Sequence, residues 1–126
     1  MIINSQTCQQ IPTREYSRFN TLPRALVFFP NDAEYPLPFH LIDISEGGLS
    51  FRYLGDKREQ TESSTISLYH ENDLIVENLP VQEVSDILLE DGLVPVRRKS
   101  VSFRALNAKQ MKHVSTFMNR FTSTTQ

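Results

Sequence analysis

The most informative stretch of the sequence is PFHLIDISEGGLSFRY, which spans residues 38–53. Its first part, residues 38–44, is rich in apolar side chains, and its last part, residues 49–53, alternates apolar with polar ones. Gly47 and Gly48 stand between the two parts, and a glycine pair between two such runs is typical of a tight turn. The stretch therefore predicts a β-hairpin that turns at these two glycines.

The rest of the chain predicts further strands. Apolar runs bounded by turn residues indicate one strand at residues 25–29, before the hairpin, and three after it, at residues 65–70, 79–89 and 93–106. The charged and polar run at residues 56–64 is expected to be a solvated loop, because it holds no apolar side chain. The chain is thus expected to be mainly β, with about six strands.

The end of the chain changes to a helical period. An apolar stripe with this spacing is formed by Met111, Val114, Phe117, Met118 and Phe121. Asn107 is well placed as the N-cap, so we expect a helix over residues 107–121. Such a stripe normally packs against its own domain, although a partner surface is the alternative. The predicted fold class is therefore all-β with a C-terminal helix.

Length and composition predict one domain with polar ends. The chain has 126 residues, which suits a single hydrophobic core. Residues 1–13 are polar and expected to be a flexible extension, the domain is expected to cover residues 14–121, and residues 122–126 form a polar tail. We see no signal peptide and no membrane span, and the single Cys8 suits a reducing compartment, so a cytoplasmic location is expected.

Bulk charge and scattered reactive residues exclude several functions. A net charge of -2 gives no broad basic field, so non-specific binding to nucleic acid is not favoured. The histidines His40, His70 and His113 lack the spacing of a metal site, and no nucleophile, base and acid are grouped by motif. We therefore expect no catalytic residue, no metal and no cofactor, and the chain is not predicted to be an enzyme.

Two short clusters carry the recognisable chemistry. Arg14 and Arg18 supply guanidinium groups, which bind phosphate oxygens and the O6 and N7 acceptors of guanine. Asp43 and Ser45 stand two residues apart and would share one face of a strand, where a carboxylate accepts hydrogen bonds from guanine N–H groups. Gly48 allows close approach of a base or of backbone, and permits positive φ. Solvated arginines and a turn-stabilising Asp and Ser are the plainer alternatives.

The order and spacing of these clusters resemble the PilZ family of cyclic di-GMP receptors. An R-x-x-x-R arm, Arg14 to Arg18, is followed 25 residues later by D-x-S-x-x-G, and the likeness extends to about Phe121. It implies a six-stranded antiparallel barrel. Its ligand-binding residues would be Arg14, Arg18, Asp43, Ser45 and Gly48, with weaker candidates Gly47, Arg97 and Arg98.

Two positions depart from the pattern of the family. Thr13 stands where many members have a further arginine, which leaves the number of bound nucleotides open, and Ser100 replaces a frequent glycine. The resemblance implies a bacterial second-messenger receptor whose arm, about residues 11–20, becomes ordered over cyclic di-GMP and which signals to an unidentified partner protein. The alternative is a PilZ-like adaptor that binds nucleotide weakly or not at all.

Overall fold

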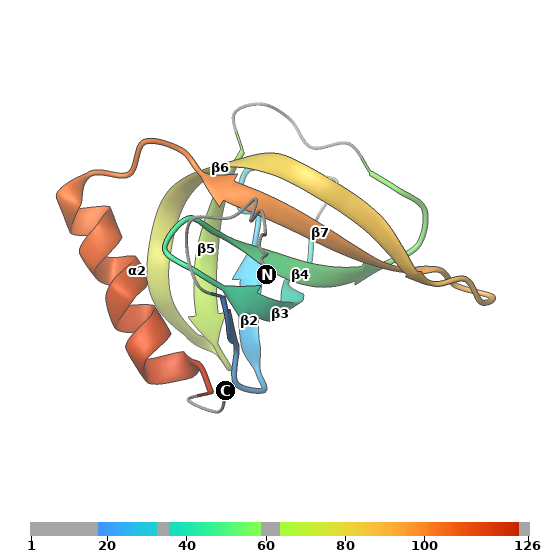
Figure 1. Cartoon of the computed structure of the whole chain (residues 1–126), viewed down its shortest axis with the longest axis horizontal. Helices are drawn as coiled ribbons and strands as arrows, with labels where there is room; N and C mark the ends of the chain where they lie inside the picture. Colours follow the sequence, from blue (N-terminus) through green and yellow to red (C-terminus); the bar gives the residue numbers. More distant parts are fainter. Residues whose placement is uncertain (1–17, 33–35, 59–63, 124–126) are drawn as a thin grey trace, which may run out of the picture.

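The computed structural model describes residues 18–32, 36–58 and 64–123. These residues form strands and one helix, arranged in Figure 1 as a barrel with the helix along one side. Their bounds are β1 (Phe19–Asn20), β2 (Ala25–Phe28), β3 (Phe39–Ile44), β4 (Gly48–Leu54), β5 (Thr65–His70), β6 (Asp73–Glu90), β7 (Val96–Phe103) and α2 (Ala108–Phe121). The predicted extension, the first arginine of the arm and Cys8 lie outside the described residues.

Six of the strands close into an antiparallel barrel. The neighbours run β3, β2, β5, β6, β7 and β4, and the pairing of β3 with β4 closes the ring. This confirms the predicted fold class. The short β1 is an additional strand that the sequence analysis did not predict; it pairs with the end of β3, where Phe19 faces Ile44 and Asn20 faces Asp43.

Strand β6 is longer than predicted. We expected it to start near residue 79, but it begins at Asp73 directly after a tight turn from β5, in which Glu71 has a φ of 57°. Its first half pairs with β5 and its second half with β7. In Figure 1 it curves from beside α2 over the barrel and then projects, paired with β7, beyond the barrel. Conversely, β7 is shorter than the expected 93–106.

The core is built from alternate residues along each strand, whose side chains point into the barrel. On β4 these are Leu49, Phe51 and Tyr53, all nearly fully buried. Such alternation is expected when one face of each strand lines a closed barrel. The outward side chains of the same strands are then free to build a site on the barrel surface.

Helix α2 packs against the barrel through one face. Val114, Phe117 and Phe121 are buried, which confirms the expected packing, while Met111 of the same predicted stripe stays exposed. Asn107 is the N-cap, as predicted: its side chain accepts from the Gln110 amide, and the Gln110 side chain accepts from the Asn107 amide. No helix in the described ranges is long and apolar enough to cross a membrane.

Candidate functional site

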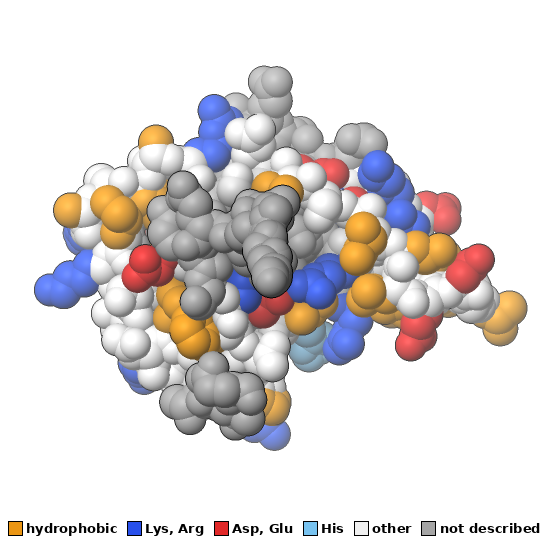
Figure 2. Space-filling view, in the orientation of Figure 1, with side chains coloured by type: hydrophobic (Ala, Val, Ile, Leu, Met, Phe, Trp, Pro, Cys, Tyr) orange, Lys and Arg blue, Asp and Glu red, His pale blue; other side chains and the backbone are white. Residues whose placement is uncertain are grey.

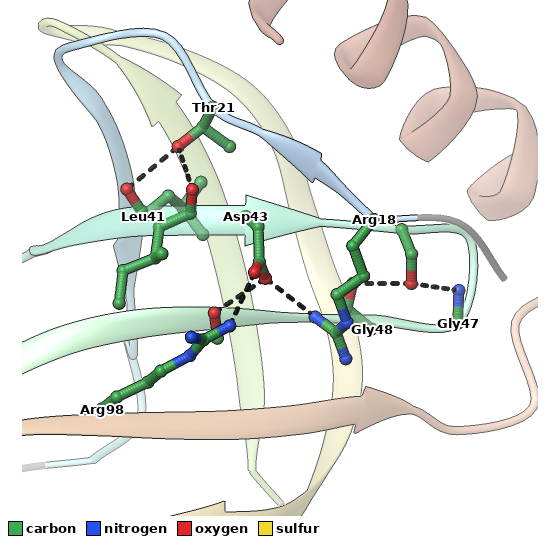
Figure 3. Close-up of polar contacts among 10 residues, drawn as sticks. Arg18, Thr21, Leu41, Asp43, Gly47, Gly48 and Arg98 are labelled. Atoms are coloured by element: carbon green, nitrogen blue, oxygen red, sulfur yellow. Dashed lines mark hydrogen bonds and ion pairs between the residues drawn. The ribbon is translucent and has the colours of Figure 1, made fainter. Parts of the chain in front are cut away.

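The candidate site is centred on the carboxylate of Asp43. Its Oδ1 accepts a hydrogen bond from Nη1 of Arg18 at 2.9 Å and another from the hydroxyl of Ser50 at 2.7 Å. Its Oδ2 accepts from Nη2 of Arg98 at 2.6 Å. Figure 3 shows the two guanidinium groups reaching this carboxylate from opposite sides. One acidic group therefore holds two arginines in place, and we call Asp43, with its partners Arg18, Ser50 and Arg98, the Asp43 clamp.

Strand register explains why these residues meet. Asp43 on β3 is the cross-strand partner of Ser50 on β4, and Ser50 is in turn the partner of Ser100 on β7. Arg98 lies two residues from Ser100 and so shares its outer face. On the other side of Asp43, β1 pairs with the end of β3 and fixes Arg18, which immediately precedes it. The site thus depends on three neighbouring strands and the arm.

The burial of Asp43 departs from what the sequence suggested. We expected its carboxylate to be available to guanine, but the residue is only 7% exposed and three side chains bond to it. The side chains of Arg18 and Arg98 remain 20% and 29% exposed. The plainer alternative, in which Asp43 only stabilises a local turn, would require bonds to its immediate neighbours, but its arginine partners are 25 and 55 residues away. Asp43 therefore positions two partly exposed cations.

Ser45 and the two glycines build the turn beside the Asp43 clamp. The Ser45 hydroxyl accepts from the Gly47 amide at 3.1 Å and donates to the Gly48 carbonyl at 3.3 Å, and the Ser45 amide also donates to that carbonyl at 2.8 Å. The Gly47 carbonyl accepts from the Phe103 amide at 2.9 Å. Ser45 therefore does stabilise the turn, as the plainer alternative proposed.

Gly48 is explained by the close approach of β7. A Cβ at this position would lie 2.1 Å from the carbonyl oxygen of Val101 and 2.9 Å from the Cα of Ser102. Gly48 has no positive φ, unlike Gly55, so conformational freedom is not the reason for a glycine here. The sequence suggested that either a nucleotide base or another backbone segment comes close to Gly48, and the close approach of backbone is confirmed.

Arg97 lies on the other face of β7. Its Nε donates to Oδ1 of Asp86 at 2.9 Å, and this hydrogen bond raises the pKa of Arg97 above its ordinary value. Asp86 also accepts from the Tyr53 hydroxyl. The fully buried Lys99, on the same face, forms ion pairs with Glu83 at 3.2 Å and Asp86 at 3.7 Å. Of the two neighbouring arginines on β7, Arg98 therefore bonds to Asp43, whereas Arg97 bonds to Asp86.

Ser50 was not predicted from the sequence, whereas the different roles of Arg97 and Arg98 could have been. Val101 faces the core, so a period of two turns Lys99 and Arg97 inward and Ser100 and Arg98 outward. No comparable signal marks Ser50, because its role follows from pairing with Asp43. Arg14 lies outside the described residues.

Solved structures of similar shape identify the architecture. The chain aligns with YcgR of Escherichia coli in complex with c-di-GMP at a TM-score of 0.64 and 18% identity, over 86% of this chain and 46% of that one. It also aligns with the PilZ domain of YcgR with c-di-GMP at a TM-score of 0.60 and 20% identity, over 82% and 87% of the two chains. The chain has a PilZ-type fold.

A third structure with this PilZ-type fold is MrkH, which is described as a c-di-GMP dependence transcription regulatory factor. It aligns at a TM-score of 0.58 and 13% identity, over 84% of this chain and 49% of MrkH. The chain thus spans about half the length of YcgR and of MrkH. No family model matches the sequence, and no curated protein matches it significantly.

Proposed function

We propose that this chain is a cyclic di-GMP receptor whose nucleotide lies over the outer face of β3, β4 and β7. The observation that carries the proposal is the convergence of Arg18 and Arg98 on the buried carboxylate of Asp43. Two positive charges share one negative charge there, so the cluster keeps a net positive charge in a chain whose net charge is -2. A local anion site of this kind suits a phosphate.

The guanidinium groups retain donors for a nucleotide. A guanidinium has five N–H donors, and Asp43 accepts one hydrogen bond from each arginine. The two side chains are 20% and 29% exposed, so part of each guanidinium can be reached from outside. We assign these accessible donors to the phosphates and to the O6 and N7 atoms of guanine. Ser45, Gly47 and Gly48 would line the base next to them, and Arg97 is left out.

The arm would complete the site. Thr21 anchors its described end, because its hydroxyl donates to the carbonyl of Leu41 at 2.9 Å and its amide donates to the carbonyl of Ile42 at 3.1 Å. Since β1 already belongs to the sheet, ordering on binding would concern the residues before Arg18, including Arg14. Fixing each of them costs about 1 to 2 kcal/mol of backbone entropy, so we expect modest affinity, on the order of micromolar. The ordered arm would then be the surface that a downstream protein recognises.

Calorimetry tests this proposal with matched variants. Cyclic di-GMP should bind the wild-type chain, whereas GTP and cyclic GMP should bind at least about tenfold more weakly. Arg98→Ala should weaken binding by about tenfold or more, because it removes charge-assisted hydrogen bonds of about 1.5 to 3 kcal/mol. Arg120→Ala, at an exposed position on α2, serves as the control and should bind as wild type does. No heat of binding for the folded wild-type chain would refute the proposal.

The alternative is an adaptor in which the clamp is purely structural. The observation that favours it is the set of three side-chain bonds already made to Asp43. In that case Arg98→Ala would lower the melting temperature, and neither the variant nor the wild type would bind cyclic di-GMP. Because MrkH is described as a transcription regulatory factor, a titration with DNA belongs beside the nucleotide titrations.

A further inference from the structure

Exposed apolar side chains gather at the projecting end of β6 and β7. We define the β6–β7 extension as residues 84–96. Of the ten exposed large hydrophobic side chains in the described ranges, seven lie on this extension or at the adjacent end of β4: Leu54, Val84, Ile87, Leu88, Leu89, Leu93 and Val94. Figure 2 shows orange side chains gathered, among red and blue ones, at the projecting end of the molecule. A concentration of this kind is typical of an interaction surface.

Strand register places basic side chains at the root of the extension. Arg52 on β4, Arg98 on β7 and Ile87 on β6 form one cross-strand row, and such partners share a face. The next row on the same face, two residues along β4 and β7, is Leu54, Val96 and Glu90. Arg52 is exposed, and no acidic side chain of the described ranges pairs with it. Arg98 pairs with Asp43, so Arg52 supplies the basic charge of the root, which leads directly into an apolar surface.

The tip of the extension is acidic and apolar, which complements the basic root. Glu90 and Asp91 are both exposed and form the acidic part, and Leu93 beside them is 105% exposed, so its side chain has no contact to lose. The basic root needs an acidic, apolar occupant, and the tip of this same chain has that chemistry. A surface that is complementary to itself forms an isologous contact, in which each copy gives its tip and receives its partner's.

We propose that the β6–β7 extension is a homodimer contact, with the tip of one copy lying on the root of the other around a twofold axis. Leu89, Leu93 and Val94 of one copy would cover Leu54 and Ile87 of the other. Glu90 or Asp91 would pair with Arg52 across the axis. An anionic lipid surface is a poorer occupant, because it would repel the acidic tip. The proposal does not depend on nucleotide binding.

Sedimentation velocity over a concentration series tests the apolar part of the contact. The wild-type chain without nucleotide should shift from monomer to dimer as its concentration rises. Leu93→Asp should weaken the dimer by about tenfold or more, because it would bury an unpaired charge. Leu37→Asp introduces the same change at another exposed leucine, outside the extension, and should leave the dimer unchanged. A wild-type chain that stays monomeric at all concentrations would overturn the proposal.

Charge exchange tests the orientation of the two copies. Arg52→Glu should weaken the dimer by about tenfold or more, because it places like charges together across the axis. Glu90→Arg should act in the same way, and combining the two substitutions should restore much of the association. If the combined variant dimerises no better than either single one, the tip-to-root arrangement is wrong. Calorimetry with cyclic di-GMP on Leu93→Asp separates the two hypotheses, since unchanged nucleotide binding is expected there.

Discussion

Asp43 controls the geometry of the candidate site, because its two carboxylate oxygens accept bonds from three side chains. The sequence pattern predicted that Asp43 matters, from its position in D-x-S-x-x-G. It could not predict the burial of Asp43, because its two arginine partners are 25 and 55 residues away and meet it only once the barrel closes. At the scale of residues, long-range pairing is what a local pattern fails to reveal.

Replacing this carboxylate should affect both folding and binding. Asp43→Ala removes the charge that separates two guanidinium groups, and we expect the free energy of unfolding to fall by about 1 to 3 kcal/mol. The loss stays below that of a wholly buried pair, because both arginines are partly exposed. Chemical denaturation measures it, and Asp73→Ala, at an exposed position, is the control. Unchanged stability would show that the clamp does not hold in solution.

Gly48 provides a second prediction at this scale. Gly48→Ala would place a methyl group against backbone atoms of β7, so we expect a loss of about 3 kcal/mol or more in the free energy of unfolding. Gly92→Ala is the matched control, since nothing lies within 4 Å of a Cβ there. If Gly48→Ala were as stable as Gly92→Ala, the close approach of Val101 would be wrong and a ligand-related reason for the glycine would gain support.

At the scale of elements, predictability depended on length and pattern. The hairpin of β3 and β4 and the helix α2 were predicted because their apolar side chains recur with a clear period over many residues. The two-residue β1 is too short to have a period. The start of β6 was missed because the turn at Glu71 and Asn72 contains neither glycine nor proline. The two residues that flank this turn, His70 of β5 and Asp73 of β6, are already cross-strand partners.

The cap of α2 gives a prediction for an element. Asn107→Ala removes the side chain that accepts from the Gln110 amide, and we expect a loss of about 1 kcal/mol in the free energy of unfolding. Asn119→Ala changes the same residue type at an exposed position within the helix and should cost less. Neither Asn107 nor Asn119 belongs to the residues that we assign to the nucleotide site, so affinity for cyclic di-GMP should not change in either variant. A change in affinity with Asn107→Ala alone would instead link the helix to the site.

For the whole molecule, the six strands of the barrel and the fold class followed from the sequence, but the additional β1 and the order of the strands did not. Closure pairs β3 with β4 and brings β7 beside β4, and this makes one outer face from residues of three strands. The same closure turns Lys99 inward towards Glu83 and Asp86, which is not expected of a lysine. Both the site and the buried charges therefore emerge from topology rather than from any one segment.

The most direct test of the nucleotide site is a two-dimensional amide NMR titration of the full chain with cyclic di-GMP. We expect the largest changes at Asp43, Ser45, Gly48 and Ser100, and little change at Ser115 in the middle of α2. Amides of residues 14–18 should also become protected from hydrogen exchange as the arm closes. A titration with no changes, or with changes confined to residues remote from Asp43, would contradict the proposal that the Asp43 clamp is the cyclic di-GMP site.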